Sequence, residues 1–431
     1  SCTVLPVDEN GTPLHKALIW MDIRAVKEAE EITATRHKYL KYSGGWVSPE
    51  WMLPKALWFK RNRQDIFNGV YRFIECTDWF TYKLTGKWTI CMDHIASKWN
   101  YVKSEGGFSL DLLEQIGMVE LMDKWPEDIK CLGDFVGGLT KNAAQDLGLV
   151  EGIPVAQGGI DAHIGMLGLG AVQAGDLALI IGSSNCHMAL SSNPVFVPEV
   201  WGPFDEAIIK GKWVLEGGQT STGSIIKWFK DNFGYMQEMM ARVRKQNVYS
   251  VLDELAEKIA PGSEGLVLLD YWQGNRSPLS DPKARGAIWG LSLNHKNEHI
   301  VRAIYEGTAY GTRHILEVLK EQGFTVSKIY AGGGGAQSKL WLQIYADVCQ
   351  LPIYITEETE AMTLGAAMTA AIGAGVYSDY SAATEKMVKF KSTIMPNRNN
   401  KLIYDFYYDK YIRTYERLKD MMHEVYETVS V

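Results

Sequence analysis

The alternation of short apolar runs with helical patterns is the feature that most constrains the fold of this 431-residue chain. In its second half, short apolar runs predict strands, and the segments between them carry apolar residues at helical spacing. The predicted strands are 177–182, 188–191, 212–216, 266–269, 328–331 and 353–356, and the predicted helices are 223–232, a long one from 300, 338–349 and 363–373. Neither an all-helical nor an all-β chain shows this alternation, so the sequence predicts an α/β fold.

The first part of the chain shows the same elements. A strand near Leu5 is followed by helical patterns, one of which is stopped by Gly86. A strand then ends in the turn Gly158-Gly-Ile-Asp161, which is a natural domain junction. A chain of this length exceeds one hydrophobic core. We therefore expect two lobes with a cleft between them, residues 1–164 and residues 165–431.

Composition excludes several classes of function. The net charge of -7, without a Lys/Arg run, disfavours nucleic acid as a partner. No apolar stretch reaches the roughly 18 residues of a membrane span, and no signal peptide is visible. The six cysteines form no CxxC pair and no His stands at zinc-finger spacing, so neither a metal knot nor a disulfide framework is indicated. We expect a cytoplasmic protein.

Two glycine-rich turns in the second half indicate a nucleotide site. In Ile329-Tyr-Ala-Gly-Gly-Gly-Gly-Ala-Gln-Ser338 a strand meets four glycines and then a helix, which lets backbone N–H groups approach an anion or a flat ring. Ile181-Gly-Ser-Ser-Asn185 offers main-chain donors and hydroxyls that suit a triphosphate. It is not a Walker A loop, because no Gly-Lys-Ser/Thr follows. A tight strand-to-helix turn and a plain hairpin stay open as alternatives.

Asp161 is the candidate catalytic base. A hydroxyl that attacks a γ-phosphoryl group must lose its proton, and an adjacent carboxylate can accept it. Asp161 follows two glycines at the proposed lobe boundary. The alternative is that it caps the next helix. His163 is expected to be a packing or capping residue.

Three segments are candidates for sugar binding, because sugar pockets combine polar groups with an aromatic wall. Each places a charged residue beside a Trp or at a strand end, and the residues concerned are Glu50, Trp51, Lys98 and Glu216. Taken singly, these charges are also typical of a solvated surface. Near the C-terminus, tyrosines from Tyr404 to Tyr415 recur on one helix face, which favours packing on its own lobe over the seam of a homodimer.

Taken in order, these segments resemble the FGGY family of carbohydrate kinases. The matching pieces are Leu18–Ala25, Asp78–Gly86, Gly158–His163, Gly182–Asn185, Asn275–Pro278 with Ala284–Ala287, and Gly332–Gly335 with Leu364–Ala367. The resemblance implies a two-lobed actin/ribonuclease H-like sugar kinase fold that uses ATP and Mg²⁺. It implies that Asp161 is the base. It also implies a cofactor-binding set of Gly182, Ser183, Gly223, Gly333, Gly334 and Ser338.

Within the family, the segments around Trp51, Lys98 and Glu216 are most similar to the ribulokinase and ribitol/ribulose kinase branch, which implies a pentulose such as ribulose as substrate. Xylulose, erythritol and glycerol are alternative substrates. A catalytically silent sugar- or nucleotide-binding protein and an actin-like or chaperone ATPase are alternative functions. Family members begin with a Gly-rich hairpin carrying an Asp, and this sequence begins at Ser1. We therefore expect a first lobe incomplete at its N-terminus and poor turnover by this polypeptide alone.

Overall fold

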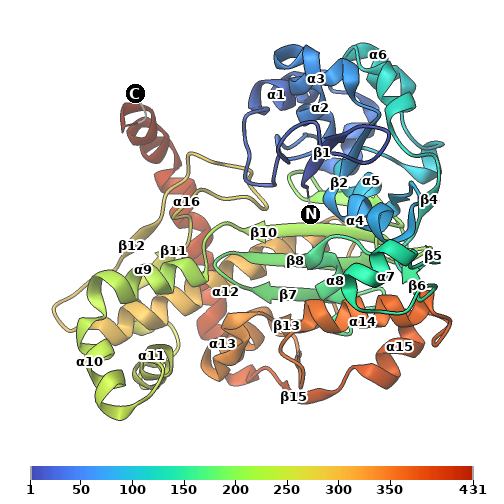
Figure 1. Cartoon of the computed structure of the whole chain (residues 1–431). Helices are drawn as coiled ribbons and strands as arrows, with labels where there is room; N and C mark the ends of the chain where they lie inside the picture. The colour runs from blue at the N-terminus through green and yellow to red at the C-terminus, as the bar shows by residue number, and fades with distance from the viewer. Residues whose placement is uncertain (1, 430–431) are drawn as a thin grey trace. The chain divides into compact units, whose positions relative to one another are not determined.

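The computed structural model describes residues 2–429 (Figure 1). The chain forms two compact units. The first unit comprises residues 1–174, 189–216 and 360–389, and the second comprises residues 175–188, 217–359 and 390–431. Both contain strands and helices, which confirms the predicted α/β class. The predicted functional lobes, 1–164 and 165–431, stay a prediction. The compact units have different boundaries because segments 189–216 and 360–389 pack with the first unit.

The first unit is built from short strands and the helices between them. β1 (Val4–Val7) pairs antiparallel with β2 (Arg72–Glu75), with Val4 opposite Glu75. The remaining strands are β3 (Ile90–Cys91), β4 (Ile129–Lys130), β5 (Phe135–Gly138), β6 (Pro154–Ala156) and β9 (Trp201–Asp205). The α-helices are α1 (Val26–Ala34), α2 (Met52–Asn62), α3 (Gln64–Gly69), α4 (Cys76–Thr85), α5 (Met92–Lys98), α6 (Leu110–Gln115), α7 (Lys141–Leu147), α8 (Asp161–Gly168), α14 (Ala361–Gly373) and α15 (Tyr380–Met387).

Helices α8 and α14 of the first unit lie side by side (Figure 1). They approach closely because each contributes a glycine to the contact. A Cβ on Gly168 would lie 1.8 Å from the carbonyl oxygen of Ala361, and one on Gly365 would lie 1.9 Å from that of Ile164. The close contact fixes α8, whose first residue is Asp161.

The second unit is organised around a mixed sheet with the strand order β15-β14-β13-β7-β8-β10. β13 (Lys328–Gly332) is parallel to both β7 (Asp176–Ile181) and β14 (Ile353–Thr356), and β15 (Phe390–Ile394) is antiparallel to β14. β8 (Asn185–Ser191) and β10 (Trp213–Gln219) belong partly to each unit. In the first unit β10 pairs antiparallel with β9. Parallel strands of this kind end at the same edge of the sheet, and β7 and β13 both end in a glycine-rich turn.

In the part of the chain that the structure describes, the second unit has six α-helices, of which α10 and α11 were not expected from the sequence. They are α9 (Gly223–Phe233), α10 (Tyr235–Arg244), α11 (Val248–Ala256), α12 (Asn297–Glu321), α13 (Lys339–Cys349) and α16 (Lys401–Val429), and a hairpin of β11 (Val267–Leu269) and β12 (Ala287–Trp289) completes the unit. The predicted apolar stripe of α12 is buried, including Ile304, Ile315 and Leu319.

The tyrosine stripe of α16 packs on its own unit. Tyr404 accepts a hydrogen bond from Arg302 at 2.7 Å, Tyr411 donates to Asp270 at 2.6 Å, and Tyr415 donates to Asp281 at 2.8 Å. These three tyrosines are buried. Packing on the same lobe is therefore confirmed, while a homodimer stays a prediction.

Two further features bear on the expectations from composition. Within residues 2–429, no helix combines the length and the apolar character that crossing a membrane requires. The six cysteines are free thiols.

Candidate active site

A cavity of about 420 Å³ in the second unit collects most of the predicted nucleotide-binding residues. Such a volume falls in the range of small-molecule sites. Gly182, Ser183, Gly223, Gly334 and Ser338 line it, and their binding of a nucleotide stays a prediction. Gly333, predicted with them, is not among the lining residues.

The turn after β7 and the start of α9 are joined by backbone hydrogen bonds. The N–H of Gly223 donates to the carbonyl of Gly182 at 3.0 Å, and the N–H groups of Thr222 and Ser224 donate to Ser183 at 2.9 and 3.1 Å. A Cβ on Gly223 would lie 2.3 Å from the Gly182 oxygen. Glycine is therefore required at position 223, and the contact holds the exposed Gly182-Ser183 turn at the cavity.

Gly333 shapes the cavity indirectly. Its φ of +83° is a conformation that glycine adopts without strain, and a Cβ there would lie 2.6 Å from the carbonyl oxygen of Ile181. The end of β13 can therefore cross close to the end of β7, which brings Gly334 to the cavity wall.

The opposite wall comes from α11, α12 and α13. Tyr305 and Trp341 stack with ring centroids 4.8 Å apart, and the Tyr305 hydroxyl donates to Asp253 at 2.7 Å. Burial raises the pKa of the Asp253 carboxyl, against the opposing effect of its hydrogen bonds. Ser338 accepts from the N–H of Trp341 at 3.0 Å and caps α13. Sequence reasoning missed the contribution of α11, which also brings Tyr249 and Ser250 to the cavity.

In the first unit, Asp161 is the first residue of α8 and its side chain is exposed. One of its carboxylate oxygens accepts the N–H of Ala162 at 2.9 Å. Asp161 is thus an accessible carboxylate in the first turn of α8, whose N-cap is Ile160, and its role as the base stays a prediction.

Asp93, which sequence reasoning missed, holds the turn that precedes Asp161. Its Oδ2 accepts the N–H of Ile160 at 2.8 Å, and its Oδ1 lies 2.5 Å from His163 Nδ1. The Asp93 side chain is fully buried. A Cβ on Gly159 would lie 2.5 Å from Asp93 Oδ2. The second glycine of Gly158-Gly-Ile-Asp161 therefore leaves room for the Asp93 carboxylate.

Lys98 and Glu216 form a buried ion pair beside this turn. Lys98 Nζ lies 2.8 Å from Glu216 Oε2, and the side chains are 4% and 11% exposed. His163 Nε2 lies 3.5 Å from the same carboxylate. Asp93, His163, Glu216 and Lys98 thus form a series of alternating charges, which offsets the cost of burying each one.

The pKa values of this series follow from burial and from the neighbours. Burial would lower the pKa of His163, but the charges of Asp93 and Glu216 raise it to about 9. Burial would raise the pKa of Glu216, but Lys98 and His163 hold it well below its usual range. Burial likewise opposes the charge on Lys98, while Glu216 and, more weakly, Glu50 raise the pKa of the ammonium group above its usual value. The expectation that His163 is merely a packing residue is therefore too simple.

Aromatic rings border the ion pair. Lys98 Nζ lies 4.3 Å from the ring centroid of Trp201 on β9. The Trp51 ring, which is fully buried, meets Trp201 edge to face at 5.5 Å. The structure thus brings Trp51, Lys98 and Glu216 together, while Glu50 is partly exposed and acts on Lys98 through its charge. Trp201 gave no signal in the sequence beyond its residue type.

Family models identify the chain. The description "FGGY family of carbohydrate kinases, N-terminal domain" matches residues 1–168, and the C-terminal domain of the same family matches residues 177–374. The chain belongs to the FGGY family of carbohydrate kinases. It is therefore an ATP-dependent kinase of a sugar or polyol, as predicted, and the family match disfavours an actin-like or chaperone ATPase.

Individual proteins agree with this assignment. An FGGY carbohydrate kinase domain-containing protein of Xenopus laevis is 34% identical, with 96% of this chain and 81% of that protein covered. A ribulokinase of Geobacillus thermodenitrificans is 35% identical, with 96% and 78% covered. The crystal structure of a xylulose kinase from Rhodospirillum rubrum superposes with a TM-score of 0.85 at 26% identity, covering 98% of this chain and 83% of that one. The predicted sugar kinase fold is thereby confirmed.

Proposed function

We propose that this FGGY kinase phosphorylates a pentulose such as ribulose, with Asp161 as the general base. The observation that carries the proposal is the buried Lys98–Glu216 pair with its tryptophan border, in a chain 35% identical to a ribulokinase. Carbohydrate sites need fixed donors and acceptors against an apolar wall, and this cluster supplies both.

The two charged groups suit an open-chain ketose. The Lys98 ammonium donates hydrogen bonds only, so it fits a carbonyl or hydroxyl oxygen, while the Glu216 carboxylate accepts from a hydroxyl. Because each group already has a charged partner, its position is fixed before the sugar arrives. Little ordering cost then remains for binding.

Asp161 would accept the proton of the attacking hydroxyl. An exposed carboxylate at the start of α8 can receive a substrate, and the Asp93–Ile160 hydrogen bond holds the turn before it. General-base catalysis contributes about 10² to 10⁴ in rate. In this scheme Asp93 and His163 are positioning residues.

The cavity of the second unit is the proposed ATP site, with Gly182 and Ser183 at the phosphates and Gly334 and Ser338 bordering the adenosine. Its fit rests on two features, the hydroxyl-bearing turn after β7 and the Tyr305–Trp341 ring pair. The nucleotide brings Mg²⁺, which supplies neutralising charge at the phosphates when bound.

A substrate screen with the base variant tests the proposal. With ATP and Mg²⁺, a coupled assay against D- and L-ribulose, xylulose, ribitol, erythritol and glycerol should give the highest kcat/KM for a ribulose. Asp161→Asn should lower kcat by about 10² to 10⁴ with little change in sugar affinity measured by calorimetry. If activity is highest on xylulose, the substrate named for the structurally similar Rhodospirillum enzyme, then xylulose replaces ribulose as the proposed substrate. Retention of most of the rate by Asp161→Asn would move the base elsewhere.

A further inference from the structure

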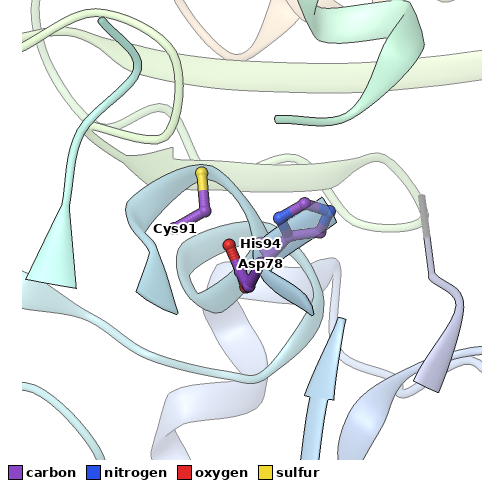
Figure 2. A group of neighbouring side chains, drawn as sticks. All are labelled: Asp78, Cys91 and His94. Carbon is purple, nitrogen blue, oxygen red and sulfur yellow. The ribbon is translucent and has the colours of Figure 1, made fainter. Parts of the chain in front are cut away.

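Three metal-ligating side chains of different chemistry gather in the first unit (Figure 2). Asp78 lies on α4, Cys91 ends β3, and His94 lies in the first turn of α5. One ligand atom from each lies within 4.8 Å of the others, and all three residues are fully buried. The spacing of thirteen residues and then three is unlike the CxxC and zinc-finger patterns, so no metal-binding motif can be recognised in the sequence.

Three polar atoms of this trio lack protein hydrogen-bond partners. Neither ring nitrogen of His94 has a hydrogen-bond partner, and neither does Oδ2 of Asp78. The other carboxylate oxygen, Oδ1, accepts from Gln157 Nε2 at 2.9 Å. A buried polar group without a partner destabilises a fold, so three such atoms in one place indicate a missing partner.

A divalent cation would satisfy all three. An ionised Asp78 and an ionised Cys91 together carry the two negative charges that balance such an ion, and His94 adds a neutral nitrogen. Without the cation, burying either anion would be costly.

We propose that Asp78, Cys91 and His94 bind a divalent transition-metal ion of the zinc type. The mixed oxygen, sulfur and nitrogen set is typical of Zn²⁺, whereas Mg²⁺ and Ca²⁺ prefer oxygen alone. The site is therefore distinct from the Mg²⁺ that accompanies ATP. Three protein ligands leave a fourth position for water.

The ion would tie α4 to α5. Helix α5 also carries Asp93 and Lys98, so its fixation would hold the turn before Asp161 and the ion pair with Glu216. This structural role rests on the proposed function, whereas the metal site itself does not.

Metal content and spectroscopy of the wild-type chain test the site directly. The protein is purified without chelator, loaded with Zn²⁺ and dialysed to remove free metal. Elemental mass spectrometry should then find one zinc ion per chain. X-ray absorption of that zinc should show one sulfur at about 2.3 Å and nitrogen or oxygen at about 2.0–2.2 Å. The Co²⁺ form should show a thiolate-to-cobalt charge-transfer band. The proposal is overturned if folded protein binds neither zinc nor cobalt stoichiometrically. It is also overturned if no sulfur atom coordinates the bound zinc.

Variants assign the ligands. Cys91→Ser should abolish the charge-transfer band, and His94→Gln should lower Zn²⁺ affinity at least tenfold. The matched control is Cys76→Ser, which changes a half-buried thiol at the start of α4 outside the trio and should keep both properties. Loss of the band in Cys76→Ser with retention in Cys91→Ser would refute the assignment. If Cys91→Ser does not fold, the wild-type absorption spectrum decides the question.

Discussion

Gly159 shows how a single residue determines the geometry next to the proposed base. A side chain there would collide with Asp93 Oδ2 and with Leu132 Cδ2, each 2.5 Å from the Cβ position. The carboxylate that accepts the Ile160 N–H would then have to move. The preceding residue, Gly158, has only an ordinary contact, with Thr77 at 3.8 Å. Two adjacent glycines of one motif thus have different physical roles.

Gly159→Ala is therefore expected to lower kcat at least tenfold and to destabilise the fold by about 1–3 kcal/mol, the usual cost of overpacking. Steady-state kinetics and urea unfolding measure the two effects. Gly158→Ala is the matched control and should stay within about 0.5 kcal/mol of the wild type. Equal behaviour of the two variants would contradict the role given to Asp93.

The sequence predicted which residues carry chemistry better than it predicted what surrounds each of them. Asp161 and Glu216 were selected because carboxylates stand at strand ends, and Lys98 because it precedes a Trp. The burial of Lys98 could not be predicted, because its partner Glu216 is 118 residues away. The Asp93–His163 contact spans 70 residues and was missed for the same reason. Local sequence patterns do not encode such long-range pairs.

Among the elements, α8 and α14 depend on glycines for their close packing. Gly365→Ala places a Cβ 1.9 Å from the Ile164 carbonyl oxygen, so one helix must shift. We expect a loss of about 1–3 kcal/mol in the free energy of unfolding and a lower kcat, because α8 carries Asp161. Thermal unfolding and kinetics check this. Ala367→Leu, at an exposed position of the same helix, is the control and should be tolerated. A stability of Gly365→Ala equal to that of the control would contradict the close contact.

The charge series linking α5, α8 and β10 predicts a pH dependence. The pKa of His163 is raised from 6.5 to about 9, so the folded state binds a proton that the unfolded state releases. The stabilisation is complete below pH 6.5 and is lost as the pH rises through about 9, roughly 3 kcal/mol in total. Chemical unfolding between pH 6 and 10 should show this decline. His163→Gln should flatten it, and an unchanged slope in that variant would exclude His163 as its source.

Element positions were predicted well where the pattern was strongly periodic. α9 and α13 begin within one residue of the expected positions, and β14 agrees fully. Helices α10 and α11 were not predicted. In α10, Met236 and Met239 are 64% and 41% exposed, so their spacing gave no clear apolar face. Strand β9 was also missed, because its Gly202 and Pro203 are residues that disfavour strands.

For the whole molecule, strand and helix alternation predicted the class but not the path of the chain. Segments 189–216 and 360–389 pack with the first unit, although the residues that flank them in sequence belong to the second. The first of them supplies Glu216 and Trp201 to the proposed sugar site, and the second supplies α14 behind α8. Contacts between residues far apart in the sequence determine which unit each segment joins. Local periodicity carries no information about such contacts.

The proposed sugar and nucleotide sites occupy different units, so variants of each should affect different substrates. Lys98→Ala removes a charged hydrogen-bond donor and should raise the KM for sugar by roughly 10–100-fold, with the KM for ATP little changed. Tyr249→Ala, at the cavity of the second unit, should do the reverse. Tyr235→Ala is its control, because Tyr235 belongs to the same unit, is 71% exposed and does not line the cavity. Calorimetric titration with each substrate separates binding from turnover. A larger loss of ATP affinity than of sugar affinity in Lys98→Ala would contradict the assignment of Lys98 to the sugar site, because removal of a sugar contact should weaken sugar binding first.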